Sequence, residues 1–383
     1  MRQIFWLCLV LLISLIFLVF LYDETEEHES IERPKKLITT KCSSGKESFD
    51  EKKQPTIDRN TIAILFINDY EKRNDQEFDL ARSTVICYAG VHGYHFELFD
   101  PLIPSISALF CLQREKPFQI PCIIANFLEA FTFEWVLYIG ADIGVINPLY
   151  RLESLIPNQD VHLVFYSESD QNPISNQSFL AKNSPRSINF LRNWADFQLK
   201  RPDFPFVDLA LPNVISSFFH PEMRSNQLIC ERILKTGRAL DYTACMQEFI
   251  FWATTSTEYY VYAKEQGFIR NGSLTNNKWS LDDFLLSGWR KWKYETEWEY
   301  SLIIESFLVP CQSIHQIDQW KYNFSYVISP ETKLKILEKH SMKELEEHRK
   351  IIKRLNSTKK LGNLFEISKN PFKFLLNNYT GNE

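Results

Sequence analysis

The chain has 383 residues, of which 45% are hydrophobic and 24% are charged, and this composition excludes a disordered or collagen-like protein. The net charge of −5 gives no indication of a nucleic-acid partner. Only 11 residues are glycine, and the glycine-rich motifs that bind dinucleotides or nucleoside triphosphates do not occur. The 30 Phe, 16 Tyr and 9 Trp predict a core rich in aromatic side chains.

Residues 4–22 form an almost unbroken apolar run that predicts a transmembrane helix. At 1.5 Å per residue such a run spans roughly 28 Å, close to the ~30 Å hydrocarbon core of a bilayer. Arg2 precedes the run and several acidic residues follow it, which predicts a cytoplasmic N-terminus. A cleaved signal peptide is the alternative, although no small-residue cleavage site follows the run. We expect a single-pass type II protein of the Golgi or endoplasmic reticulum membrane, with the bulk of the chain in the lumen.

Glycosylation sequons and cysteines agree with this location. The N-x-[ST] sequons begin at Asn176, Asn271, Asn323, Asn356 and Asn378. Of the 8 cysteines, Cys8 lies in the apolar run, and the spacing of the others does not resemble a zinc site. Disulfides or buried thiols are therefore expected in the lumenal part.

The predicted elements alternate between strands and helices from residue 61 onward. Short apolar runs predict strands over residues 61–67, 95–99, 135–139 and 161–166, and longer patterns predict helices over residues 79–89, 121–131 and 187–199. This alternation is typical of an α/β fold in which helices cover both faces of a parallel sheet. We therefore expect a short cytoplasmic tail (1–3), the anchor (4–22), a flexible charged stem (23–55) and a globular domain (56–330).

The chain after the globular domain is a helical and polar extension over residues 331–383. Residues 331–353 predict an amphipathic helix whose apolar positions are Leu334, Leu337, Met342 and Leu345. The mixed charges predict a solvated outer face, and a helix that binds a membrane surface or a partner is the alternative.

The segment with the clearest chemical meaning follows the strand predicted over residues 135–139. It continues as Gly140-Ala-Asp142 and reaches Asn147-Pro148. In open α/β sheets ligands bind beyond the carboxyl ends of the strands, so Asp142 is placed to hold a divalent cation and, through it, a diphosphate. A turn aspartate that caps the next helix is the alternative.

Several segments resemble the galactosyl-, mannosyl- and xylosyltransferase superfamily, and in particular an uncharacterised branch known mainly from nematodes. Cys87-Tyr-Ala-Gly-Val-His92-Gly93-Tyr94 is similar to its Y-x-x-x-H-G-Y segment, and Ile139 to Pro148 is similar to L-D-A-D-I-G-V-V-N-P. Two later segments resemble W-L-T-x-x-K-W-S and D-F-M-x-H-G-W-K. They are Ser273-Leu-Thr-Asn-Asn-Lys-Trp-Ser280 and Asp283-Phe-Leu-Leu-Ser287-Gly-Trp-Arg290. The resemblance covers residues 60–325.

The resemblance implies a GT-A-like, Rossmann-like domain that transfers a sugar from a nucleotide-diphosphate donor to a glycan or glycoprotein acceptor. In the family, the two Asp of an Asp-Ala-Asp turn and a later His hold Mn²⁺ against the nucleotide diphosphate. In this chain these positions carry Gly140, Asp142 and Ser287, so Asp142 is the remaining ligand for metal and cofactor. Asp208 matches the Asp of a G-[ST]-D-N-G segment and is the candidate catalytic residue that orients donor or acceptor hydroxyls.

Two functions stay open at this point. One is an active glycosyltransferase, in which Tyr138 and Trp279 line the pocket unless they are core aromatics. The other is a pseudoenzyme that keeps the fold as a binding or assembly partner, which the loss of two metal ligands favours. If only the ligands are missing, Gly140→Asp together with Ser287→His is expected to restore the binding of a divalent cation.

Overall fold

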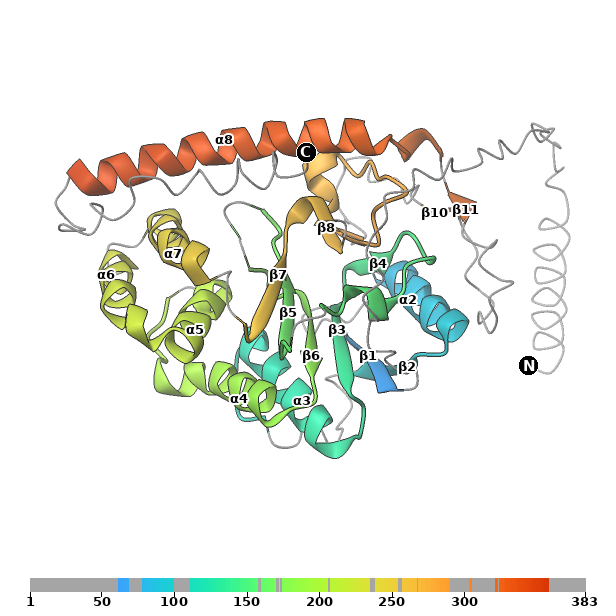
Figure 1. Cartoon of the computed structure of the whole chain (residues 1–383), viewed down its shortest axis with the longest axis horizontal. Coiled ribbons are helices and arrows are strands. Elements are labelled where there is room, and N and C mark those ends of the chain that lie inside the picture. Colours follow the sequence, from blue (N-terminus) through green and yellow to red (C-terminus); the bar gives the residue numbers. More distant parts are fainter. Residues whose placement is uncertain are drawn as a thin grey trace, which may run out of the picture. The chain divides into compact units, whose positions relative to one another are not determined.

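The computed structural model describes residues 61–68, 78–99, 111–157, 160–169, 172, 174–205, 207–234, 238–253, 257–266, 268–289, 303–304, 321–322 and 324–357. The chain divides into the units Met1–Lys52 and Lys53–Glu383, and every described residue belongs to the second unit (Figure 1). The predicted anchor (4–22) and stem (23–55) lie outside the described residues. Within the described ranges, no helix is both long and apolar enough to cross a bilayer.

Strands and helices are interspersed along the described chain. The strands are β1 (Ile62–Ile67), β2 (His95–Phe99), β3 (Trp135–Gly140), β4 (Ile143–Val145), β5 (Leu163–Tyr166), β6 (Ser178–Lys182), β7 (Tyr259–Tyr262), β8 (Ile269–Asn271), β9 (Leu285–Ser287), β10 (Ile303–Ile304) and β11 (Lys321–Tyr322). The α-helices are α2 (Asp79–His92), α3 (Lys116–Ala130), α4 (Pro185–Lys200), α5 (Ala210–Phe219), α6 (Arg224–Leu234), α7 (Ala239–Ala253) and α8 (Pro330–Ser357). Short 3₁₀ turns include η3 (Leu152–Leu155), η4 (Val207–Leu209), η6 (Lys264–Gln266) and η7 (Gly272–Thr275).

Six strands form the central sheet in the order β2-β1-β3-β6-β5-β7. The pairs β1–β2, β1–β3 and β5–β7 are parallel, whereas β6 is antiparallel to both of its neighbours. The expectation of a mostly parallel sheet flanked by helices is confirmed, and β6 is its antiparallel strand. Strand β6 was not predicted because it is short and ends in polar residues, so its five residues show little alternation.

Both faces of the sheet are buried, as the continuous apolar strands predict. Alternate residues of β1 enter different cores, with Leu65 in a cluster that includes α3, α4 and the helices α5–α7, and Ile64 in a cluster that includes α2 and the strands β4 and β9. Tyr138 and Trp279 are 2% and 0% exposed within these clusters, so they are core aromatics.

Two disulfides cross-link the helices of the first core. Cys111–Cys122 ties the segment before α3 to that helix, and Cys230–Cys245 joins α6 to α7. These four cysteines are therefore paired, one of the two states that the sequence predicted for them.

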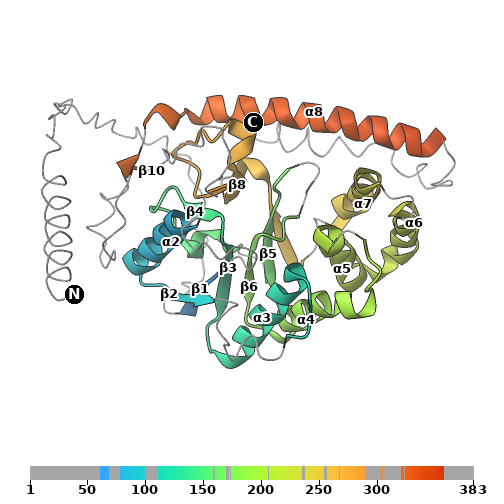
Figure 2. The same cartoon turned by 180° about the vertical axis from the view of Figure 1, so that it is seen from behind.

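Helix α8 packs along the unit and contacts α7 and η7 (Figures 1 and 2). The predicted apolar stripe is right for Leu337, which is fully buried, and wrong for Leu334 and Met342, which are 37% and 64% exposed. The buried stripe instead contains Lys333 and ends at Leu355. The buried stripe differs from the predicted one because the carboxylates of Asp282 and Asp283 pair with Lys333 and so allow this charged residue of α8 to be buried.

Candidate active-site edge

The carboxyl ends of the parallel strands define one edge of the central sheet, which we call the site edge. Asp142 follows β3 and Glu168 follows β5 at this edge. Because β6 runs in the opposite direction, the segment that precedes it, including Gln177, also lies there. In open α/β sheets ligands bind at such an edge, so these side chains are the candidates for the site.

A second sheet, in the order β4-β9-β8, joins distant parts of the chain at this edge. Ile143 lies opposite Ser287, and Ser287 lies opposite Asn271. The backbone carbonyl of Asp142 accepts hydrogen bonds from the N–H groups of Gly288 and Trp289, each 3.0 Å long. The structure thus brings the backbone segments of Asp142 and Ser287 together.

The glycines of these two segments have specific roles. Gly288 has φ +100°, a conformation that favours glycine, where it donates to the Asp142 carbonyl. A Cβ on Gly144 would lie 2.6 Å from the ring of Trp289, so that ring packs directly on the backbone of β4. The Ile-Gly-Val and Ser-Gly-Trp segments are therefore two halves of one packed unit.

Glu168 is a polar residue of the site edge that no sequence motif singled out. Its carboxylate accepts a 2.8 Å hydrogen bond from Asn271 Nδ2 and a 2.9 Å bond from Asn172 Nδ2. The sequence signal that could have identified Glu168 is its position two residues after the buried strand β5. Asn271 Oδ1 in turn accepts from the N–H and hydroxyl of Ser273, at 2.9 and 2.7 Å. This sequon asparagine is therefore also part of the site edge.

The electrostatics of the edge are set by its two carboxylates. Tyr166 is buried, which raises the pKa of its hydroxyl, and the negative charges of Glu168 and Asp142 raise that pKa further. The hydroxyl of Tyr166 accepts a 3.0 Å hydrogen bond from Ser175. A neutral tyrosine thus lies within the field of both carboxylates.

Gly140 lies at the position that the resemblance assigns to a first metal-binding aspartate. Its N–H donates a 3.0 Å hydrogen bond to the carbonyl of Gln177. A Cβ added to Gly140 would lie only 2.7 Å from that carbonyl oxygen. The backbone before β6 therefore occupies the space that a side chain at position 140 would need. Gly140→Asp needs this backbone to shift, and the simple restoration expected from the sequence does not apply.

The segment that matches Y-x-x-x-H-G-Y, from Tyr88 to Tyr94, forms hydrogen bonds with residues 148–153, which follow Asp142 in the chain. Tyr88 donates to the carbonyl of Tyr150 at 3.0 Å, and His92 Nε2 lies 2.6 Å from the carbonyl oxygen of Pro148. Tyr94 donates to Glu153 at 2.6 Å and accepts from the N–H of Leu152 at 3.1 Å. Gly93 ends α2 with φ +74°. This motif is therefore a scaffold for the loop beside Asp142.

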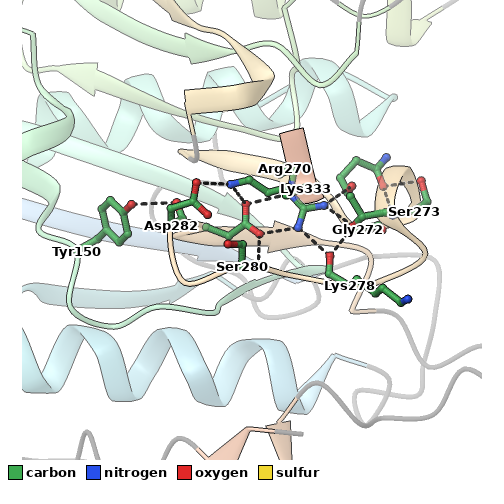
Figure 3. A network of polar contacts seen from close by, with 11 residues as sticks. Tyr150, Arg270, Gly272, Ser273, Lys278, Ser280, Asp282 and Lys333 are labelled. Carbon is green, nitrogen blue, oxygen red and sulfur yellow. Dashed lines mark hydrogen bonds and ion pairs between the residues drawn. The ribbon is translucent and has the colours of Figure 1, made fainter. Parts of the chain in front are cut away.

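A buried ion pair holds the segments that carry Asn271 and Ser287. Arg270 donates to both carboxylate oxygens of Asp283, at 2.9 and 2.6 Å, and both side chains are fully buried (Figure 3). Arg270 also donates to Thr275 Oγ1 at 2.7 Å and to the Lys278 carbonyl at 3.0 Å. Burial alone raises the pKa of Asp283, but the hydrogen bonds and charge of Arg270 outweigh it, so this pKa is lowered.

The other predicted site residues are Asp208 and four of the sequon asparagines. Asp208 lies in η4 before α5, and its side chain is not among those the structure describes. Asn176 is half-buried beside Gln177, and Asn356 lies in the last turn of α8. Asn323 and Asn378 lie outside the described residues.

The residues present do not fit the divalent-cation site of the resembled family. Of the three positions that the resemblance assigns to metal ligands, only Asp142 carries a carboxylate. Ser287 is 4% exposed, and the backbone of Gln177 closes the position at Gly140. Among the described residues, no three His, Cys, Asp or Glu side chains are grouped so that they could hold a metal ion.

These features define a mixed α/β protein with a polar edge at the carboxyl ends of its strands. The chain belongs to the family described as "Protein of unknown function, DUF273", whose model matches residues 85–303. No curated protein matches it in sequence.

Two solved glycosyltransferases are similar in structure. One takes part in the glycosylation of the major capsid of PBCV-1, with 15% identity, 59% of this chain and 91% of that chain covered, and a TM-score of 0.36. The other is GlyE of Streptococcus pneumoniae TIGR4, with 17% identity, 51% of each chain covered and a TM-score of 0.29.

Proposed function

We propose that this protein is a glycosyltransferase-like protein of the secretory pathway that binds a nucleotide-diphosphate sugar at the site edge. The observation that carries the proposal is the pair of hydrogen bonds from Gly288 and Trp289 to the Asp142 carbonyl. They join two segments, about 145 residues apart, that both match one donor site in the resembled family.

We propose that the donor binds without a metal ion held as the resembled family holds it. Glu168, Asn271 and Asp142 offer carboxylate and amide groups of the kind that bind sugar hydroxyls, and the half-buried edge excludes part of the solvent. No residue that the structure describes replaces the lost imidazole or the first carboxylate. Transfer to a glycan or glycoprotein acceptor is then slow, because little neutralises the leaving diphosphate.

The loss of metal ligands also favours a second function, that of a pseudoenzyme. In that case the same edge binds the donor without turning it over, and the protein acts as a binding or assembly partner in the Golgi or endoplasmic reticulum. Hydrolysis of a UDP-sugar by the purified protein, with Mn²⁺ present, distinguishes the two functions, because only the enzyme turns the donor over.

Calorimetric titration with UDP tests the binding that both functions share. We expect UDP to bind the wild-type protein with an affinity that Mn²⁺ changes little, and Asp142→Ala to weaken it. Asp160→Ala is the matched control, because Asp160 is an exposed aspartate at the opposite end of β5. The proposal fails if UDP does not bind, or if both variants bind UDP as the wild type does.

A further inference from the structure

Helix α8 is joined to three parts of the unit by ion pairs along its length. Near its start, Lys333 Nζ lies 2.7 Å from Asp282 Oδ2 and 3.1 Å from Asp283 Oδ1. In its middle, Glu344 pairs at 3.7 Å with Lys264, which lies in η6 shortly after β7. Near its end, Arg354 pairs with Asp241 in the first turn of α7.

The pair near the start of α8 is the most deeply buried of the three. The side chain of Lys333 is 3% exposed, and that of its partner Asp283 is 0% exposed. A buried ammonium is stable only when it is paired, and Lys333 is paired with two carboxylates. Figure 3 shows Lys333 reaching from α8 to Asp282 and to the carboxylate that Arg270 holds.

These contacts lead from α8 to the site edge through the segment of residues 268–289, which we call the β8–β9 limb. Arg270 lies on β8 next to Asn271, whose amide contacts Glu168. Asp283 lies two residues before β9, which ends at Ser287. The N–H of Ser280 also donates to Asp283, at 2.9 Å. One carboxylate therefore links Lys333 to both strands that border the site.

We propose that α8 is a strap that holds the β8–β9 limb at the site edge, and that Lys333 is its positioning residue. Lys333 contacts Asp282 and Asp283, and it acts on the site by ordering the strands that carry Asn271 and Ser287. The ordering of the limb stands independently, whereas the consequence for donor binding rests on the proposed function.

The test measures amide hydrogen exchange of the limb and UDP affinity in the full-length protein. Lys333→Met removes the charge at similar length, Lys335→Met is the control on the exposed face of the same helix, and Lys333→Arg is the conservative variant. In Lys333→Met we expect limb amides to exchange about tenfold faster or more, while β1 and β3 stay protected. We expect UDP affinity to fall by about 2- to 30-fold, and Lys333→Arg to recover most of both effects.

Three results separate the possible failures. If the limb in Lys333→Met exchanges as it does in Lys335→Met, the strap is overturned. If the limb loosens but UDP affinity stays unchanged, the positioning role is overturned. If wild-type protein does not bind UDP, the proposed function fails, and limb exchange still decides whether α8 orders the limb. Should Lys333→Met not fold, Asp282→Asn weakens the same contact at a carboxylate that is 43% exposed, and the same criteria apply.

Discussion

A single backbone contact decides what can replace Gly140. Because a Cβ there would lie 2.7 Å from the Gln177 carbonyl oxygen, Gly140→Ala should lower the free energy of unfolding by roughly 1–3 kcal/mol, as overpacking typically does. Chemical denaturation measures the change. Asp142→Ala, two residues further along, removes a half-buried side chain without crowding and should cost less. Equal stabilities of wild type and Gly140→Ala would show that the strands separate easily at this point.

The same contact predicts how an engineered metal site behaves. Ser287→His adds an imidazole beside the Asp142 turn, whereas Gly140→Asp must first displace the segment before β6. We therefore expect Ser287→His alone to raise Mn²⁺ affinity, measured by calorimetry with UDP present, as much as the double variant does. A double variant that binds Mn²⁺ far more tightly than Ser287→His would show that the segment before β6 moves without penalty.

The charge of Asp283 makes stability depend on pH. Its folded-state pKa lies below its ordinary value of 3.8, so the stabilisation is present above about pH 4 and is lost as the pH falls through the folded-state pKa. Asp283→Asn should destabilise the protein by about 3–5 kcal/mol at pH 7, because Arg270 and Lys333 lose their carboxylate, and should flatten the acid limb of the stability curve.

Asp160→Asn is the control for this pH dependence. The pKa of Asp160 is also lowered, by its hydrogen bond to Lys182, but its side chain is 84% exposed and solvent screens the pair. Its substitution should change the acid limb much less. Parallel pH profiles for Asp283→Asn and wild type would contradict the assignment of this charge.

At the scale of elements, the hydroxyl of Tyr94 connects the turn between α2 and β2 to η3. Tyr94→Phe removes its bonds to Glu153 and to the N–H of Leu152, and leaves a buried N–H without its acceptor. We expect a loss of about 1–3 kcal/mol of stability, seen in denaturant unfolding, and faster exchange of amides 146–153. Tyr260→Phe is the control, and an equal effect of both changes would contradict the role of the motif.

The disulfide between α6 and α7 stabilises the helices beside the central sheet. Its cysteines are 15 residues apart, a spacing for which loop closure contributes about 3 kcal/mol. The double variant Cys230→Ser with Cys245→Ser should therefore be less stable by about 2–4 kcal/mol without reductant and should differ little from reduced wild type. A difference that persists under full reduction would show that packing of the sulfurs, and not the bond, is what matters.

For the whole molecule, the sequence predicted those elements whose pattern lies within a short stretch of neighbouring residues. Strand β1 is visible because an apolar run is a local pattern. Helix α4 was predicted over residues 187–199, and in the structure it begins two residues earlier, at Pro185, with Ser184 as its cap. Helices α5–α7 were not predicted, although α5 is strongly apolar.

The site was harder to predict because its contacts are not local. The contact between Glu168 and Asn271 joins residues 103 positions apart, and only the register of the sheets brings them together. Asp142 and Ser287 were paired by the resemblance and not by any spacing. The closed position at Gly140 depends on β6, which the sequence did not reveal as a strand.

The proposed lumenal location predicts N-glycans on the protein made in a secretory host. Peptide-N-glycosidase should increase its mobility in gels, with Asn356 and Asn378 in the polar extension as the first candidates. A C-terminal tag should also resist protease in intact microsomes. Digestion of the tag without detergent would contradict the type II topology, and protein that never shifts in gels would contradict the lumenal location.

The most direct measurement of the central claim is the hydrogen-exchange footprint of UDP on the full-length protein. If the Asp142 turn and the β8–β9 limb form one donor site, UDP should slow exchange in two stretches that are distant in sequence, residues 138–146 and 268–289. Helices α5–α7 serve as the internal reference and should exchange at the same rate with and without UDP. Protection confined to other parts of the chain, or protection of only one of the two stretches, would contradict the account.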